Sequence, residues 1–136
     1  MPQQFHAMSL LVRDYDEAIH WYTEVLGFDL LEDTPRGPDK RWVRIAPRGS
    51  AGACLLLARA GNAGQATYVG NQTGGRVFLF LHTDDFAGDY ARLLAHGVRF
   101  CEEPRQEEYG TVVVFEDLYG DRKSTRLNSS HIPLSR

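Results

Sequence analysis

Residues 12–28 read VRDYDEAIHWYTEVLGF and carry both the start and the end of one amphipathic helix. Asp14 is suited to cap the first turn, because its carboxylate can accept an orphan backbone N–H at the positive end of the helix dipole. Gly27 predicts the end of the helix, since glycine adopts a left-handed conformation at little cost. Apolar residues recur between these two positions at helical spacing, which indicates one buried stripe: Ala18, Ile19, Tyr22, Val25 and Leu26.

A second helix of the same kind follows 70 residues later, because Asp84 to Gly97 spans the same interval as Asp14 to Gly27. Residues 83–85 can cap it. We expect an internal duplication, with one supersecondary unit used twice. The apolar face of the second helix is formed by Ala87, Tyr90, Ala91, Leu94 and Ala95.

Runs of apolar and β-branched residues flank both helices and predict strands. The segments between them read as loops, because Gly, Pro and polar residues predominate at 34–39 and 60–75 and the acidic segment 102–108 suits a solvated face. Residues 60–75 form either a linker between the halves or a mobile loop over a site. The predicted strands are residues 5–12, 28–32, 41–46, 53–58, 77–81, 98–101 and 111–115.

Length and composition are those of a globular domain, with 136 residues, 43% of them hydrophobic and 24% charged. The net charge of −3 offers no electrostatic case for nucleic acid, and no Lys/Arg run suggests a membrane surface. The longest apolar runs fall far short of the ~20 residues that a membrane helix needs. No basic-then-apolar leader opens the chain, so we expect a cytoplasmic protein with Cys54 and Cys101 buried and reduced.

The block at 12–28 resembles the opening of vicinal-oxygen-chelate proteins, the superfamily of glyoxalases, bleomycin-resistance proteins and extradiol dioxygenases. Their first module reads V-x-D, then a helix ending in F/Y-Y, then L-G-F. The second half is similar to the family at 83–86 and 94–98, and FEDLYG at 115–120 is close to its F-x-D-P-x-G-N turn. The resemblance covers residues 5–120.

This resemblance implies an α+β fold of two βαβββ modules in tandem, whose sheets form a curved, mixed sheet around a shared cleft. Residues 1–120 would then form a single domain, with module 1 at about 5–59, a linker at about 60–75 and module 2 at about 76–120. Many relatives pair as dimers, so a homodimer is implied as well.

The enzymes of this family hold a divalent metal in the cleft, where it acts as a Lewis acid. Carried over residue by residue, the ligand positions read Ala7, Leu56, Phe78 (or Arg76, if the register moves by two) and Ser124. The first three of these cannot bind a cation, and a serine hydroxyl is a poor ligand. We therefore expect no metal cofactor, with a divalent metal held by displaced ligands as the alternative.

Aromatic and basic side chains alternate along the predicted strands. A pocket with aromatic walls and an arginine suits a flat or anionic small molecule. Strand parity alone does not tell whether these side chains line the cleft or the core under a helix. The candidate ligand-binding residues are Trp42, Arg44, Phe78, Phe80, His82 and Tyr109.

The function expected from these features is metal-independent binding of a small molecule, similar in principle to the antibiotic-sequestering members of the superfamily. The alternative is an enzyme, a metal-dependent lyase or dioxygenase with displaced ligands such as His6, His82 and Glu116. A third possibility is an accessory protein without a ligand.

The segment after Gly120 departs from the family pattern. Residues 121–131 read DRKSTRLNSSH, which resembles the in-frame translation of a sequencing adaptor. We hypothesise that it is appended sequence; the alternative is a genuine tail, and the nucleotide sequence distinguishes the two. In either case we expect 121–136 to be disordered and the final strand of the family to be missing or weakened.

Overall fold

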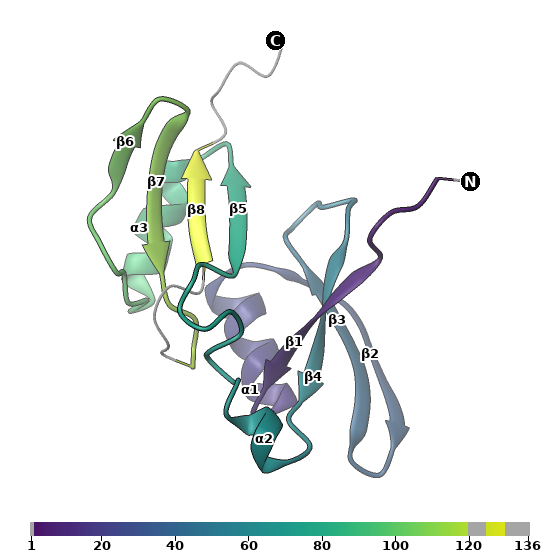
Figure 1. The fold of residues 1–136 in the computed structure, drawn as a ribbon. Helices are drawn as coiled ribbons and strands as arrows, with labels where there is room; N and C mark the ends of the chain where they lie inside the picture. The colour runs from purple at the N-terminus through teal and green to yellow at the C-terminus, as the bar shows by residue number, and fades with distance from the viewer. Residues whose placement is uncertain (1, 120–124, 130–136) are drawn as a thin grey trace. The chain divides into compact units, whose positions relative to one another are not determined.

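The computed structural model describes residues 2–119 and 125–129. The chain forms two compact units, Met1–Val69 and Gly70–Arg136 (Figure 1). Each unit contains one four-stranded mixed sheet, in the order β1-β4-β3-β2 in unit 1 and β5-β8-β7-β6 in unit 2. The α+β class and the duplicated module are therefore confirmed.

Unit 1 pairs β1 with β4 in parallel, and β3 with both β4 and β2 in antiparallel fashion. Helix α1 contacts β3 and β4 and covers one face of this sheet. The elements are β1 (Ala7–Val12), α1 (Tyr15–His20), η1 (Trp21–Val25), β2 (Asp29–Gly37), β3 (Lys40–Ala46), β4 (Cys54–Arg59) and α2 (Ala63–Ala66). The fully buried core consists of Leu10, Val12, Ala18, Tyr22, Val43, Ile45 and Leu57.

Unit 2 repeats this scheme, with β5 parallel to β8 and β7 antiparallel to both β8 and β6. Rings of α3 and the strands pack in series, since Tyr90 lies 4.8 Å from Phe100 and Phe100 lies 5.9 Å from Phe115, centroid to centroid. The elements are β5 (Leu79–Thr83), α3 (Phe86–Ala95), β6 (Arg105–Glu107), β7 (Gly110–Phe115) and β8 (Thr125–Ser129).

The two helices are capped as predicted, with a difference of one residue. Asp14 accepts the backbone N–H of Glu17 at 2.9 Å, whereas in unit 2 the cap is Asp85 rather than Asp84. Asp14 thus lies 13 positions before Gly27, and Asp85 lies 12 positions before Gly97. The extra residue of the first helix coincides with its π-helical second half, since a π-turn accommodates one more residue than an α-turn. Among the residues described, no helix is long and apolar enough to cross a membrane.

Three local predictions were wrong. Residues 34–39 were expected to form a loop, but β2 continues to Gly37 because it pairs with β3 as far as that residue. The strand expected at 98–101 is reduced to a bridge between Phe100 and Phe115, and β6 forms within the acidic segment instead. The stretch 60–75 contains the short helix α2, capped by Asn62.

The two cysteines differ in their surroundings. Cys54 is buried in β4, whereas Cys101 is exposed, contrary to the prediction that both are buried. Neither forms a disulfide in the described part of the chain.

The prediction of a missing final strand was also wrong. Residues 125–129 form β8, which lies between β5 and β7, so neighbours on both sides satisfy its backbone groups. Burial alternates from Thr125 to Leu127, because Thr125 and Leu127 are 0% and 3% exposed and Arg126 between them is half-buried. Residues 120–124 and 130–136 lie outside the described part, and the origin of the tail remains a hypothesis.

Leu127→Ala tests the contribution of β8 to the fold. Removing a buried leucine side chain from a central strand should lower the free energy of unfolding by about 2–5 kcal/mol. The measurement is urea unfolding, with Leu94→Ala as control, because Leu94 is 50% exposed on α3. Equal effects of the two substitutions would show that β8 does not pack in the core.

Candidate functional site

Each sheet has one face under its helix and one face turned away from it, and β3 shows which is which. The Arg41 backbone N–H donates to the Tyr15 hydroxyl at 3.3 Å, and the Arg41 guanidinium lies 5.1 Å from the Tyr15 ring. Arg41 is therefore on the side of α1. Trp42 and Arg44 point to the opposite side, since side chains alternate along a strand. We call this opposite side the helix-free face of unit 1; by register it carries Ala7, Glu32, Thr34, Trp42, Arg44, Cys54 and Leu56.

An ion pair lies at the centre of the helix-free face of unit 1. Arg44 Nε donates to Glu32 Oε1 at 2.9 Å, and the Thr34 hydroxyl donates to Glu32 Oε2 at 3.1 Å. Arg44 Nη1 lies 3.7 Å from Cys54 Sγ. The hydrogen bond from Arg44, and next the one from Thr34, lowers the pKa of Glu32, and Glu32 in turn raises the pKa of Arg44. The charge of Arg44 is thus already balanced within the protein.

An aromatic platform lies beside this ion pair. Trp42 is half-buried and pairs across the hairpin with Thr34. The Arg36 guanidinium lies over the indole, with Cζ 5.6 Å from the ring centroid. The ring thus already makes a cation–π contact within the protein.

The family's metal-ligand positions in this chain do not fit a cation. Ala7 and Leu56 lie on the helix-free face, where Leu56 pairs with Arg44 across the sheet, and Phe78 directly precedes β5. None of these three side chains has a lone pair to offer, and Ser124 lies outside the described residues. Within residues 2–119 and 125–129, no group of three or more His, Cys, Asp or Glu side chains is arranged to hold a metal ion.

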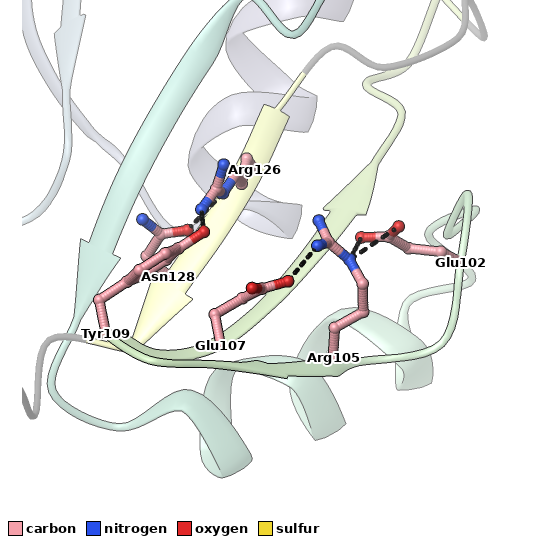
Figure 2. Close-up of polar contacts among 6 residues, drawn as sticks. All are labelled: Glu102, Arg105, Glu107, Tyr109, Arg126 and Asn128. Carbon is pink, nitrogen blue, oxygen red and sulfur yellow. Dashed lines mark hydrogen bonds and ion pairs between the residues drawn. The ribbon is translucent and has the colours of Figure 1, made fainter.

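Unit 2 also carries an arginine among aromatic rings on the face away from its helix. Arg126 of β8 points opposite to the buried Thr125 and Leu127, and its guanidinium lies 5.5 Å from the Phe80 ring and 5.3 Å from the Tyr109 ring. Figure 2 shows its hydrogen bonds, from Nη2 to the Tyr109 hydroxyl and from Nε to Asn128 Oδ1 at 2.8 Å.

The charge of Arg126 differs from that of Arg44 in having no counterion. Across residues 2–119 and 125–129, no carboxylate lies within ion-pair distance of Arg126. The nearby Glu107 pairs with Arg105 instead, as does Glu102 at 3.2 Å (Figure 2). The face of unit 2 therefore presents a positive charge between two rings, a combination suited to an anionic or aromatic group.

Two of the residues suggested as displaced metal ligands, His82 and Glu116, lie apart from each other. His82 pairs with Asn128 in register, is exposed, and does not cap α3, since Asp85 does so. Asn128 also pairs with Val112, which lies four residues before Glu116 on the same chain segment. His82 and Glu116 are thus separated by roughly 13 Å along the sheet, too far to share one cation.

Two of the residues at these sites were not predicted from the sequence. Glu32 could have been found as the charged partner opposite Arg44 in a hairpin, but a register irregularity between Leu30 and Glu32 hides the pairing. Arg126 belongs to the segment expected to be disordered. The sequence pattern that could have identified its strand is the two-residue spacing of Thr125 and Leu127.

A separate groove of about 490 Å³ lies on unit 1. Three of its charged groups already have partners, since Asp14 caps α1 and Asp33 binds Arg41 at 2.7 Å. None of the predicted ligand-binding residues lines it, so we do not place the candidate site there. The lining residues are Asp14, Tyr15, Asp33, Pro35, Gly37, Pro38, Asp39, Lys40, Arg41 and Arg59.

A duplicated βαβββ chain with two four-stranded mixed sheets is typical of a glyoxalase-like protein. The family model of the Glyoxalase/Bleomycin resistance protein/Dioxygenase superfamily matches residues 4–122. The chain belongs to this superfamily. A protein of Shewanella frigidimarina (strain NCIMB 400) is 54% identical over 122 residues, which cover 89% of this chain and 90% of that protein.

Solved structures show the same fold. The crystal structure of UcmS2 is 28% identical with a TM-score of 0.80, covering 94% of this chain and 98% of that one. The crystal structure of TnmS3, an antibiotic binding protein from Streptomyces sp. CB03234, is 30% identical with a TM-score of 0.72, covering 95% of this chain and 97% of that one.

Titration of Glu32 tests the ion pair. Its carboxyl should titrate below the ordinary value of 4.5, because Arg44 stabilises the charged form. The pair then stabilises the fold at neutral pH, and this contribution is lost as the pH falls through the lowered pKa. Carboxyl-carbon NMR should show the Glu32 pKa rising in Arg44→Met. In Arg41→Met the pKa of Asp33 should rise instead; an unchanged Glu32 pKa in Arg44→Met would contradict the pairing.

Proposed function

We propose that this protein binds a small aromatic or anionic molecule on its helix-free sheet faces. It does so without a resident metal ion and without catalysing a reaction of the molecule. The observation that carries the proposal is the repeated combination of an arginine and aromatic rings away from the helix. Trp42 stands beside Arg44 in unit 1, and Phe80 and Tyr109 flank Arg126 in unit 2.

The exposure of these rings supports binding over a role in the core. Phe80 is 57% exposed and Tyr109 is 40% exposed, whereas the rings in the core, such as Tyr22 and Phe115, are almost fully buried. A flat ligand would cover apolar area on such rings, contributing roughly 25 cal/mol per Å² before the entropic cost of binding.

The metal-ligand positions support the metal-independent form of the proposal. Ala7, Leu56 and Phe78 replace donors by carbon, which suits contact with an apolar ring system. A relative described as an antibiotic binding protein, TnmS3, has the same fold, which supports sequestration as the type of function. The homodimer and the cytoplasmic location inferred from the sequence stay predictions.

Trp42→Ala tests the proposal. Thermal shift with a panel of flat aromatic compounds, neutral and anionic, should find members that stabilise the protein in the presence of EDTA, since a ligand of the native state raises the unfolding temperature. Calorimetric titration should then show about tenfold weaker binding to Trp42→Ala, through lost stacking and burial.

The matched control is Trp21→Ala, which removes an indole from η1 and should leave affinity unchanged once folding is verified by circular dichroism. Two results would contradict the proposal: no panel member stabilises the protein, or binding disappears in EDTA and returns with a divalent metal. The latter would favour the metal-dependent enzyme.

A further inference from the structure

The charges of the helix-free face of unit 1 determine what a ligand meets there. Around Trp42 this face carries the guanidinium groups of Arg36 and Arg44 and the carboxylate of Glu32. Arg36 lies over Trp42, whereas Arg44 is bound to Glu32 through its Nε atom. The arginine predicted from the sequence to attract an anion is therefore the one that already has a counterion.

We propose that Glu32 is a specificity-determining residue of this face: by holding Arg44, it weakens the binding of an anionic aromatic group relative to an uncharged one. The inference rests on the proposed function, and it names the charge class of the ligand group that unit 1 takes.

The argument starts from competition for one guanidinium. An anionic group that approaches Arg44 has to displace or share Glu32, which accepts 2.9 Å and 3.1 Å hydrogen bonds from Arg44 and Thr34. Rotation of the Glu32 side chain away from Arg44 would break both bonds. An uncharged ring that packs against Trp42, two positions along β3, leaves the bonds between Glu32, Arg44 and Thr34 in place.

The partial exposure of the pair keeps this competition modest. The side chains of Arg44 and Glu32 are 23% and 30% exposed, so solvent screens their attraction. Partly exposed ion pairs of this kind change an equilibrium constant, here that of anion binding, by about two- to fivefold. Glu32 thus sets a preference and does not act as an absolute barrier.

The test compares two ring systems that differ in charge, naphthalene-1-sulfonate and naphthalene-1-sulfonamide, by calorimetric titration of the full chain at neutral pH. Glu32→Gln keeps the shape and one acceptor oxygen but removes the charge. We expect it to strengthen sulfonate binding about two- to fivefold and to leave sulfonamide binding unchanged. Arg36 is present in both proteins, so its attraction for the sulfonate cancels in the comparison.

Two variants locate the effect. Asp33→Asn removes the same charge from the neighbouring position of β2, where the side chain binds Arg41 under α1; it should leave the sulfonate-to-sulfonamide ratio as in the wild type. The double variant Glu32→Gln, Arg44→Met should not show the stronger sulfonate binding of Glu32→Gln, because that increase depends on the Arg44 guanidinium. Thermal unfolding confirms that each variant is folded.

Each remaining outcome overturns the inference. If the wild type binds both probes and Glu32→Gln leaves their ratio unchanged, the specificity role fails and the proposed function stands. If Asp33→Asn changes the ratio as much as Glu32→Gln, the effect is one of net charge. If neither probe binds the wild type or Glu32→Gln, this inference fails; the wider ligand panel decides separately whether the proposed function fails with it.

Discussion

The alternation of side chains along a strand is the constraint on which the account depends. In unit 1, Val43 and Ile45 point under α1 and are fully buried. Trp42 and Arg44 alternate with them along β3 and therefore point to the opposite face. In unit 2, the buried Thr125 and Leu127 force Arg126 outward in the same way. The two-residue alternation thus places apolar side chains in the core. It places rings and guanidinium groups on the face that the helix does not cover.

The two arginines, Arg44 and Arg126, both lie on helix-free faces but have different neighbours. Arg44 has a carboxylate at 2.9 Å, whereas the polar neighbours of Arg126 are a phenol and an amide. A neutral partner orients a guanidinium without cancelling its charge, whereas a carboxylate does both. Among the described residues, Arg126 therefore keeps a charge that no carboxylate balances, whereas Glu32 balances the charge of Arg44.

The sequence was sufficient for the fold class and for the duplication, because caps, apolar stripes and terminating glycines are local signals. Asp14, Gly27 and Gly97 have the roles predicted for them. The site was predicted only in part. Parity correctly grouped Trp42 with Arg44 but could not identify their face, which depends on where the helix packs. Strand β8 was missed because its backbone pairing with two neighbouring strands, a nonlocal property, outweighs its weak apolar pattern.

The central claim is that a face lined by rings and guanidinium groups, with carbon at the metal-ligand positions, binds a small aromatic molecule directly. Amide and indole NMR of labelled protein during titration with naphthalene-1-sulfonamide, in EDTA, tests it most directly. The account predicts that the Trp42 indole N–H and neighbouring β3 amides shift and saturate together. Shifts confined to the groove around Tyr15 and Arg59, or shifts that require an added divalent metal, would contradict it.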